Sequence, residues 1–224
     1  MTRLLSAATW PEIEPRAVVL VPVGSVEQHG PHLPMDTDTT VADAVARGVA
    51  ARVPRAWVAP PILYGASGEH QSFAGTSSIG TEVLHAVLVE LTRSMRTWAG
   101  SVVFINGHGG NVTALNRAVR QLVAEGHQVA WAACKSEEVD LHAGRTETSL
   151  LLHLRPDDVH LDRAAAGDIR ALNEILPALI AGGVAAVSAN GVLGDPAGAS
   201  AVEGELVLAS MIDSVMSAVG ELLS

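Results

Sequence analysis

The chain has 224 residues, of which 48% are hydrophobic and 17% are charged, so it is neither a disordered nor a fibrous protein. This length allows one domain with a substantial core, and we expect a single domain over residues 1–224. The formal net charge of −10 argues against a nucleic-acid or anionic-membrane partner, because both bind clusters of Lys and Arg. A small-molecule or peptide substrate is expected instead.

Three further features of the sequence concern its cellular location. No apolar run reaches the roughly 18 residues of a membrane span. The first fifteen residues are interrupted by Pro11, Glu12 and Glu14, which is unlike a signal peptide. The single cysteine, Cys134, permits no internal disulfide. We therefore expect a cytoplasmic protein with no membrane partner.

Short apolar runs alternate with segments of helical periodicity, which is typical of an α/β fold with helices on the faces of a sheet. The expected strands lie at residues 17–24, 56–60, 101–105 and 128–133. The expected helices lie at residues 39–52, 83–98, 112–125, 147–154 and 174–180, and a last helix follows residue 200. The rest of segment 155–193 carries no signal from which a function can be assigned.

Several helix ends and helix faces can be predicted in more detail. Asp38 or Thr39 can cap the helix at 39–52, and Asn111 can cap the helix that follows it. Ser200 and Glu203 form a capping box before the last helix. In the helix at 83–98, the stripe expected to pack on the sheet consists of Val83, Leu84, Val87, Leu88, Leu91, Met95 and Trp98. In the last helix, the expected apolar face consists of Leu208, Met211, Val215, Val219 and Leu222.

The stretch GSVEQHGPHLPMDTD, at residues 24–38, concentrates histidines and acids directly after the first strand. Glu27, His29 and Asp38 are its candidate metal ligands, and Pro31 and Pro34 stiffen the chain between them. Imidazole and carboxylate groups together suit Zn, Mn or Fe(II). For any one of these residues a solvated surface loop is the simpler explanation, but the density of donors favours a site.

Two later clusters also follow expected strands. SVVFINGHGGN places His108 at the carboxyl end of the strand at 101–105, and LHAGRTETS places His142 in a loop and Glu147 in the first turn of a helix. Ligands of open α/β sheets bind at the carboxyl ends of the strands, so the clusters are expected to converge on one pocket. Glu69 and His70, in a loop rich in glycine and serine, are candidates for substrate contact.

The three clusters, in this order and spacing, resemble the creatininase family of metal-dependent amidohydrolases over nearly the whole chain. The resemblance implies a three-layer α/β/α sandwich with a mostly parallel central sheet, and a homo-oligomer. It also implies two divalent ions (Zn, Fe(II) or Mn) per chain. Glu27 and His108 would hold one ion, His29 and Glu147 the other, and Asp38 would bridge both, while His142 would be a proton shuttle.

The segments APPILYGASGEHQSFAGT and GVLGDPAGAS resemble one branch of this family, in which a peptidase trims a small modified precursor peptide. Three positions depart from the family pattern. Creatininase itself has a glutamate where this chain has Gly110, which argues against creatinine as the substrate. Relatives usually have proline at Ala74 and often an acid at Arg145, and these two differences can alter the pocket.

The residues also fit the chemistry of amide hydrolysis. Two cations bridged by one carboxylate can lower the pKa of a shared water from about 15.7 toward about 7, which supplies a hydroxide nucleophile. His142 is then available to protonate the leaving nitrogen. His32, Asp36 and Asn106 are expected to orient the ligands, with a purely structural hydrogen bond as the alternative for each.

We therefore predict a metal-dependent peptidase that removes a short C-terminal segment from a small modified peptide. Two other classes stay open. The first is an amidohydrolase that acts on a small cyclic amide or a formamide with the same metals. The second is a structural or regulatory metal protein, against which the glycines around His108 and the free His142 argue.

Overall fold

The computed structural model describes residues 2–135 and 140–223. Five strands form one parallel sheet in the order β1, β3, β2, β4, β5. The strands are β1 (Arg3–Leu4), β2 (Val18–Val23), β3 (Ala56–Val58), β4 (Ser101–Asn106) and β5 (Val129–Ala133). The α-helices are α1 (Thr37–Ala50), α2 (Gly80–Met95), α3 (Val112–Ala124), α4 (Arg145–Leu154), α5 (Leu172–Gly182) and α6 (Ala201–Leu223).

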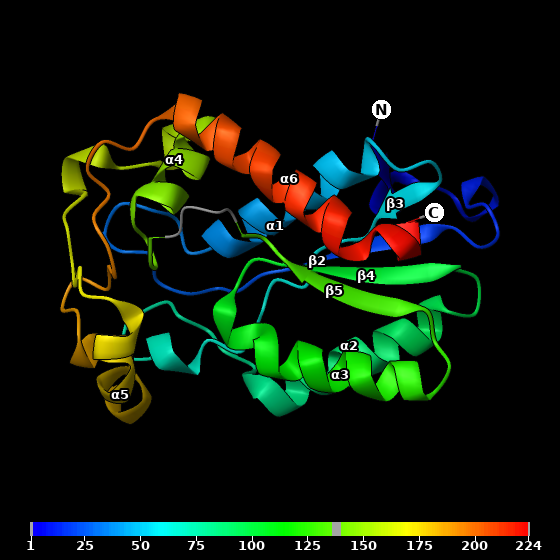
Figure 1. The fold of residues 1–224 in the computed structure, drawn as a ribbon, viewed down its shortest axis with the longest axis horizontal. Helices are drawn as coiled ribbons and strands as arrows, with labels where there is room; N and C mark the ends of the chain where they lie inside the picture. The colour runs from blue at the N-terminus through cyan, green and yellow to red at the C-terminus, as the bar shows by residue number, and fades with distance from the viewer. Residues whose placement is uncertain (1, 136–139, 224) are drawn as a thin grey trace.

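The sheet is covered on both faces, which gives the expected three-layer α/β/α architecture (Figure 1). Helices α1, α4 and α6 pack on one face around Leu20 and Ile105, and α2 and α3 pack on the other around Val21 and Phe104. All six residues of β2 are buried, as is usual for a parallel strand between two helical layers. The sequence pattern therefore predicted the fold class correctly.

The register of the central strands places their carboxyl ends side by side. Val23 of β2 pairs with Asn106 of β4, and Asn106 pairs with Ala133 of β5. The loops that leave these strands therefore start at the same edge of the sheet. All three polar clusters of the sequence follow one of these strand ends.

Helix α5 lies outside the three layers, next to the short 3-10 helix η3 (Gly68–His70) (Figure 1). It packs into a small separate apolar cluster that contains Ile175, Val184 and Leu193. No α-helix among the described residues combines the length and the apolar character that crossing a membrane requires.

The cap predicted for α1 is wrong, and the cap predicted for α3 is correct only in its position. Helix α1 begins at Thr37, so Asp38 lies inside its first turn, and its carboxylate contacts other side chains instead of backbone N–H groups. Asn111 does stand at the N-cap position of α3, but its side chain makes no capping hydrogen bond. Both side chains are used for contacts with residues distant in the sequence, which local propensity cannot predict.

The capping box predicted before α6 forms only in part. The backbone N–H of Glu203 donates to Ser200 Oγ at 3.2 Å, but the carboxylate of Glu203 accepts hydrogen bonds from Arg145 and Ser149 instead. The apolar face of α6 is as predicted, since Met211, Val215 and Val219 are buried and Leu208 and Leu222 pack beside them.

The predicted stripe on α2 is wrong on one side. Val83 and Val87 are 53% and 38% exposed, whereas Leu84, Leu88 and Val89 are buried against the sheet. Because valines and leucines occupy adjacent helical positions, the apolar face of α2 is broad. Only the part of that face that carries Leu84 and Leu88 packs on the sheet.

Because α2 buries Leu84 and exposes Val83, we predict that substitutions of these adjacent residues change the free energy of unfolding by different amounts. Leu84→Ala should lower the free energy of unfolding by about 2–5 kcal/mol, because it opens a cavity in the core. Val83→Ala, at a largely exposed position, should change it by about 0.5 kcal/mol or less. Denaturant unfolding of both variants measures the difference. Equal losses would contradict the observed orientation of α2.

Candidate active site

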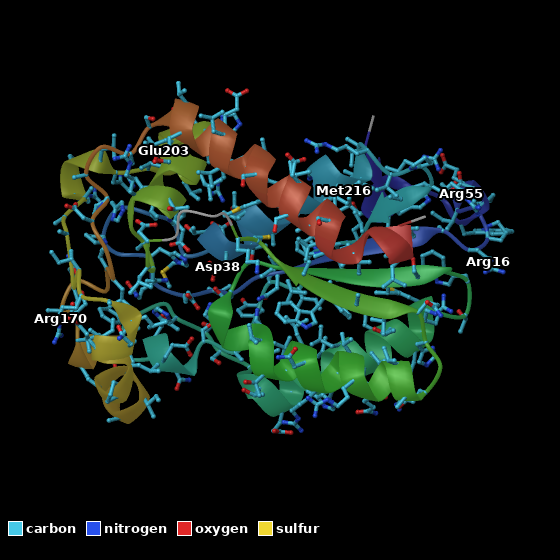
Figure 2. All side chains as sticks on the ribbon, in the orientation of Figure 1. Arg16, Asp38, Arg55, Arg170, Glu203 and Met216 are labelled. Carbon is cyan, nitrogen blue, oxygen red and sulfur yellow. The ribbon has the colours of Figure 1, made fainter. Side chains whose placement is uncertain are left out.

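The predicted ligands of all three clusters meet at the carboxyl edge of the sheet. Glu27 and His29 follow β2, Asp38 lies in the first turn of α1, His108 follows β4, and Glu147 lies in the first turn of α4. Figure 2 shows Asp38 at the end of α1 that faces these loops. The side chains of the first four are at most 6% exposed, and that of Glu147 is 25% exposed.

Asp38 lies between two histidines. Its Oδ1 is 3.1 Å from His29 Nε2, and its Oδ2 is 3.2 Å from His108 Nδ1. The ligand atoms of Glu27, Asp38 and His108 lie within 4.8 Å of one another, and so do those of His29, Asp38 and Glu147. Asp38 therefore belongs to two groups of three potential ligands. Glu27, His29 and His142 form a third group at the same distance limit.

Glu27 provides a test of whether these residues fit a metal ion. Its side chain is fully buried, and neither carboxylate oxygen has a hydrogen-bond partner among the described residues. A buried carboxylate without hydrogen bonds is expensive unless a cation lies beside it. Imidazole nitrogens and carboxylate oxygens are also the ligand atoms that Zn, Mn and Fe(II) accept. The donor set therefore fits divalent cations.

Short local hydrogen bonds orient several of these side chains. His29 Nδ1 is 3.1 Å from the carbonyl oxygen of Glu27, a contact that directs Nε2 toward Asp38. The Ser25 hydroxyl donates to Asp38 Oδ2 at 2.6 Å, and the backbone N–H of Ala143 donates to Glu147 Oε2 at 2.7 Å. Such contacts set the direction in which a ligand atom points and so tune metal affinity.

The charges in the cluster shift its titration strongly. Burial alone would lower the pKa of His29, but the carboxylates of Asp38 and Glu147 raise it to about 10. Burial raises the pKa of Glu147 to about 7, although His29 opposes this change. A divalent cation at these ligands competes with protons, so its binding releases protons and weakens as the pH falls.

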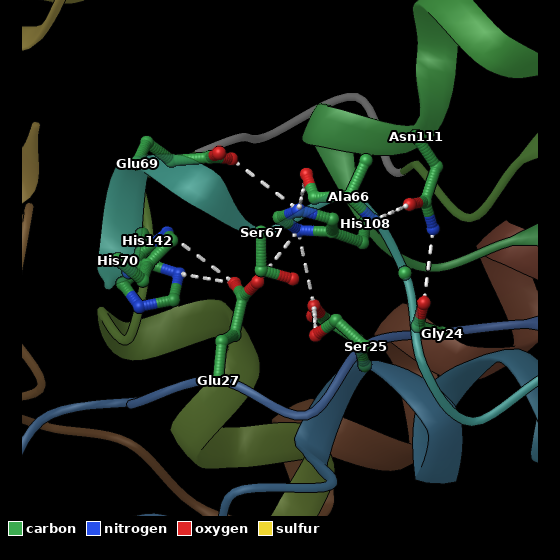
Figure 3. Close-up of polar contacts among 12 residues, drawn as sticks. Gly24, Ser25, Glu27, Ala66, Ser67, Glu69, His70, His108, Asn111 and His142 are labelled. Carbon is green, nitrogen blue, oxygen red and sulfur yellow. Dashed lines mark hydrogen bonds and ion pairs between the residues drawn. The ribbon is translucent and has the colours of Figure 1, made fainter. Parts of the chain in front are cut away.

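His142 and His70 lie beside the ligands. Their ring centroids are 4.4 Å apart, and the ring centroid of His142 is 4.3 Å from that of His29. Both point toward Glu27, whose Oε1 is 3.7 Å from His142 Nδ1 and 3.4 Å from His70 Nε2 (Figure 3). Burial, together with the nearby His29 and His70, lowers the pKa of His142 well below its usual value.

Glu69, the other candidate for substrate contact, approaches from the opposite side of His108. Its carboxylate is 3.3 Å from His108 Nε2, whereas His108 Nδ1 faces Glu27 (Figure 3). The same Nδ1 is also 3.2 Å from Asp38 Oδ2. Glu69 is 36% exposed at its side chain, and His70 is 5% exposed. Of the two, only Glu69 has an appreciably open side chain.

The three residues expected to orient the ligands differ in their contacts. His32 Nε2 is 2.9 Å from Thr148 Oγ1, next in sequence to Glu147. Asn106 Nδ2 donates to the carbonyl oxygen of His108 at 2.7 Å. Asp36 instead accepts hydrogen bonds from Arg155 at 2.9 Å, and none of its described side-chain contacts is with a candidate ligand.

Three further buried residues, which were not predicted from the sequence, hold the site together. Ser25 contacts Asp38 as described above. Asn111 accepts from the backbone N–H of Ala66 at 2.8 Å and donates to the carbonyl oxygen of Gly24 at 2.9 Å, so it joins the loops that surround the site (Figure 3). Gln28 contacts both His70 and His142. The only signal for Gln28 was its position between two candidate ligands.

A cavity of about 770 Å³ opens over this cluster. One side is polar and is lined by Glu27, Glu69, His70, His108 and His142. The cavity is also lined by apolar side chains, which include Leu172, Leu176 and Ile180 of α5. Segment 155–193, to which the sequence assigned no function, therefore contributes a wall of the candidate site.

Comparison with known proteins identifies the class. The family model described as "Creatininase: Creatinine amidohydrolase" matches residues 6–219. The chain belongs to the creatininase family, and the homologous enzymes indicate an amide hydrolase. A solved creatininase mutant described as Zn-Zn type superposes with a TM-score of 0.81 at 29% identity, covering 99% of this chain and 98% of that chain.

Two curated relatives represent different branches of the family. The mycofactocin precursor peptide peptidase of Mycobacterium ulcerans is 56% identical over 94% of this chain and 85% of its own length. The creatinine amidohydrolase of Pseudomonas putida is 31% identical over 95% of this chain and 94% of its own length. The greater similarity is thus to a peptidase.

Proposed function

We propose that this chain is a metal-dependent peptidase that cleaves a short C-terminal segment from the modified mycofactocin precursor peptide. The observation that carries the proposal is the 56% identity to a peptidase of that name over 94% of the chain. The proposal includes a single creatininase-like metallohydrolase domain over residues 1–224, a cytoplasmic location and a homo-oligomeric assembly.

The shape of the cavity supports a peptide substrate. Its polar side holds the hydrolytic residues, and its apolar side, which includes Leu176, extends along α5. A peptide can lay its apolar side chains on α5 while one backbone amide lies over the cluster. By its resemblance to creatininase, this chain has Gly110 where that enzyme is expected to have a glutamate, so it lacks that carboxylate.

Two divalent ions (Zn, Fe(II) or Mn) fit the two ligand groups that share Asp38. Glu27 and His108 would hold one ion, His29 and Glu147 the other, with Asp38 between them. Bound there, the ions would supply a strong nucleophile at neutral pH by lowering the pKa of water from about 15.7 to about 7. The remaining residues bind and orient the peptide and move protons.

His142 is proposed to transfer the proton that the leaving nitrogen requires. Its ring lies at the edge of the cluster and lines the cavity, with Nδ1 3.7 Å from Glu27 Oε1. A neutral imidazole can accept a proton as the nucleophile forms and return it to the departing amine. Glu69 lines the same cavity and is proposed to contact the substrate together with His70.

The first prediction of the proposed function concerns Asp38. Asp38→Ala should abolish binding of both ions, because each ligand group then loses a member. Asp43→Ala is the matched control, since Asp43 is on the same helix and pairs with Arg47. Metal content after gel filtration, measured by elemental analysis, should fall from two ions per chain to none only in the first variant. Two ions retained by Asp38→Ala would exclude the bridging role.

The second prediction separates ligand from proton shuttle. His142→Ala should keep both ions and lose roughly 10²–10⁴-fold in kcat, because only a proton-transfer group is removed. Glu147→Ala should instead lose one ion. His153→Ala, an exposed change on α4, is the control. If His142→Ala lost an ion but kept the native rate per remaining bound ion, His142 would be a metal ligand. Its grouping with Glu27 and His29 permits that role.

The third prediction concerns the substrate. The metal-loaded protein should release a C-terminal dipeptide from the tailored mycofactocin precursor peptide and leave creatinine and simple formamides intact, as followed by mass spectrometry. Leu176→Asp should raise KM for the peptide about tenfold, equivalent to about 1.4 kcal/mol, because it puts a charge on the apolar wall.

Asn173→Asp, an exposed change on the same helix, is the control and should leave KM unchanged. Turnover of a small cyclic amide or formamide, with the peptide intact, would assign the chain to the alternative amidohydrolase function.

A further inference from the structure

Gln28 is a buried residue between two candidate ligands, and its side-chain amide joins three separate segments. It is 5% exposed. Its Nε2 is 2.8 Å from His70 Nδ1 in η3 and 3.0 Å from the carbonyl oxygen of Gly191, in the loop between α5 and α6. Its Oε1 accepts from the backbone N–H of Gly30 at 2.9 Å. Two of these partners are backbone groups, whose roles as hydrogen-bond donor or acceptor are fixed.

Two backbone groups determine which way the Gln28 amide faces. The N–H of Gly30 can only donate, and the carbonyl of Gly191 can only accept. The reversed amide would place two N–H groups together at Gly30 and two oxygens together at Gly191. Only the observed orientation satisfies both contacts.

This orientation determines the position of the proton on His70. The amide nitrogen of Gln28 has two hydrogens, and one of them is donated to Gly191. The other points to His70 Nδ1, which must therefore accept and carry no hydrogen. In neutral His70 the proton is then on Nε2, which is 3.4 Å from Glu27 Oε1.

The main chain of Gln28 determines the proton position on His142 in the same way. Its carbonyl oxygen is 2.7 Å from His142 Nε2, so this nitrogen must donate. The amide nitrogen of Gln28, 3.0 Å from the same atom, has no hydrogen left for it. His142 Nδ1 is left with its lone pair, on the side of the ring that faces Glu27 Oε1 at 3.7 Å.

We propose that Gln28 is a positioning residue that holds both His70 and His142 in the tautomer with the proton on Nε2. The consequence, which rests on the proposed function, is that Nδ1 of His142 is the atom that accepts and returns the proton. His70, by contrast, presents an N–H to the buried carboxylate of Glu27 and stays oriented toward it. One residue thus assigns opposite hydrogen-bonding roles to the two imidazole nitrogens that face Glu27.

Gly191 is adapted to this role of Gln28. Its φ of +82° is disfavoured for other residues, and a Cβ there would lie 1.9 Å from Gln28 Oε1. The loop that follows α5 therefore approaches the Gln28 amide as closely as only glycine permits. This contact connects the loop that follows α5, a helix that lines the cavity, to Gln28 and so to His70 and His142.

The tautomers can be measured directly. We would prepare the Zn²⁺-loaded protein with ¹⁵N-labelled histidine, record long-range ¹H–¹⁵N spectra of the imidazoles, and assign the signals with His70→Ala and His142→Ala. Both rings should show a protonated Nε2 and an unprotonated Nδ1. A proton on Nδ1 of either ring in the native protein would overturn the proposal.

Two substitutions of Gln28 test its side chain. Gln28→Leu removes the donor, so His70 should become a mixture of tautomers. Gln28→Glu replaces the donor by an acceptor, so a proton should appear on His70 Nδ1. His142 should keep its proton on Nε2 in both variants, because its partner is the main chain. Gln71→Leu, the same change at an exposed glutamine, should leave both spectra unchanged.

Folding is checked by circular dichroism, and the Leu variant provides the answer if the Glu variant does not fold. An unchanged His70 spectrum in a folded Gln28 variant would show that the amide does not set the tautomer. Activity gives a second readout: kcat for the peptide should fall roughly 10–100-fold with metal content nearly unchanged, because His70 no longer presents an N–H to Glu27.

The two proposals can fail separately. Native tautomers as expected, in a protein that does not cleave the peptide, would refute the proposed function and leave the role of Gln28 intact. If the native protein cleaves the peptide but carries a proton on Nδ1 of His142, the role of Gln28 is refuted and the proposed function stands.

Discussion

Three carboxylates share a small buried volume at the edge of the sheet, and this concentration of like charge is the constraint on which the site depends. Glu27 is fully buried, and among the described residues its carboxylate meets only histidine nitrogens at 3.2–3.7 Å. Asp38 and Glu147 lie close enough to raise the pKa of the same histidine, His29. Carboxylates packed this closely cannot all be ionised without positive charge beside them. A proton on His29 or divalent cations can supply that charge. The pKa of Glu147, about 7, reflects burial and the nearby carboxylates, which raise it, and His29, which lowers it.

The fold brings these groups together by close backbone contacts. Because β2 and β4 end at the same level, the turn after β4 lies against the first turn of α1. A Cβ at Gly107 would lie 2.3 Å from the carbonyl oxygen of Asp38, so a larger residue there would push α1 away from the strand ends. Asn111 fixes the same region by joining the loops at Gly24 and Ala66. The separation between Asp38 and His108 is thus set by main-chain packing.

The sequence predicted the parts of this arrangement that have local signals. Four of the five strands were predicted, and β1 (Arg3–Leu4), which has only two residues, was not. The five candidate ligands lie in three short motifs that follow predicted strands, and ligands bind at the carboxyl edge of a parallel sheet, so the motifs were expected to meet there. The rotation of α2 and the use of Asp38 and Asn111 depend on which distant groups each side chain meets. The α5 wall and the Gln28 network also join residues far apart in the chain, so no local pattern indicated them.

The division of the cavity into two sides has a consequence for how specificity can vary in this fold. The polar side is built from loops anchored in the central sheet, whereas the apolar side belongs to α5, which has its own small core around Ile175. Substitutions on α5 can therefore change the substrate while the ligand geometry, held by the main chain of β2, β4 and α1, stays the same. Such a separation allows one architecture to accommodate different substrates. Gln28 limits that independence, because its contact with Gly191 ties the loop after α5 to the two histidines that face Glu27.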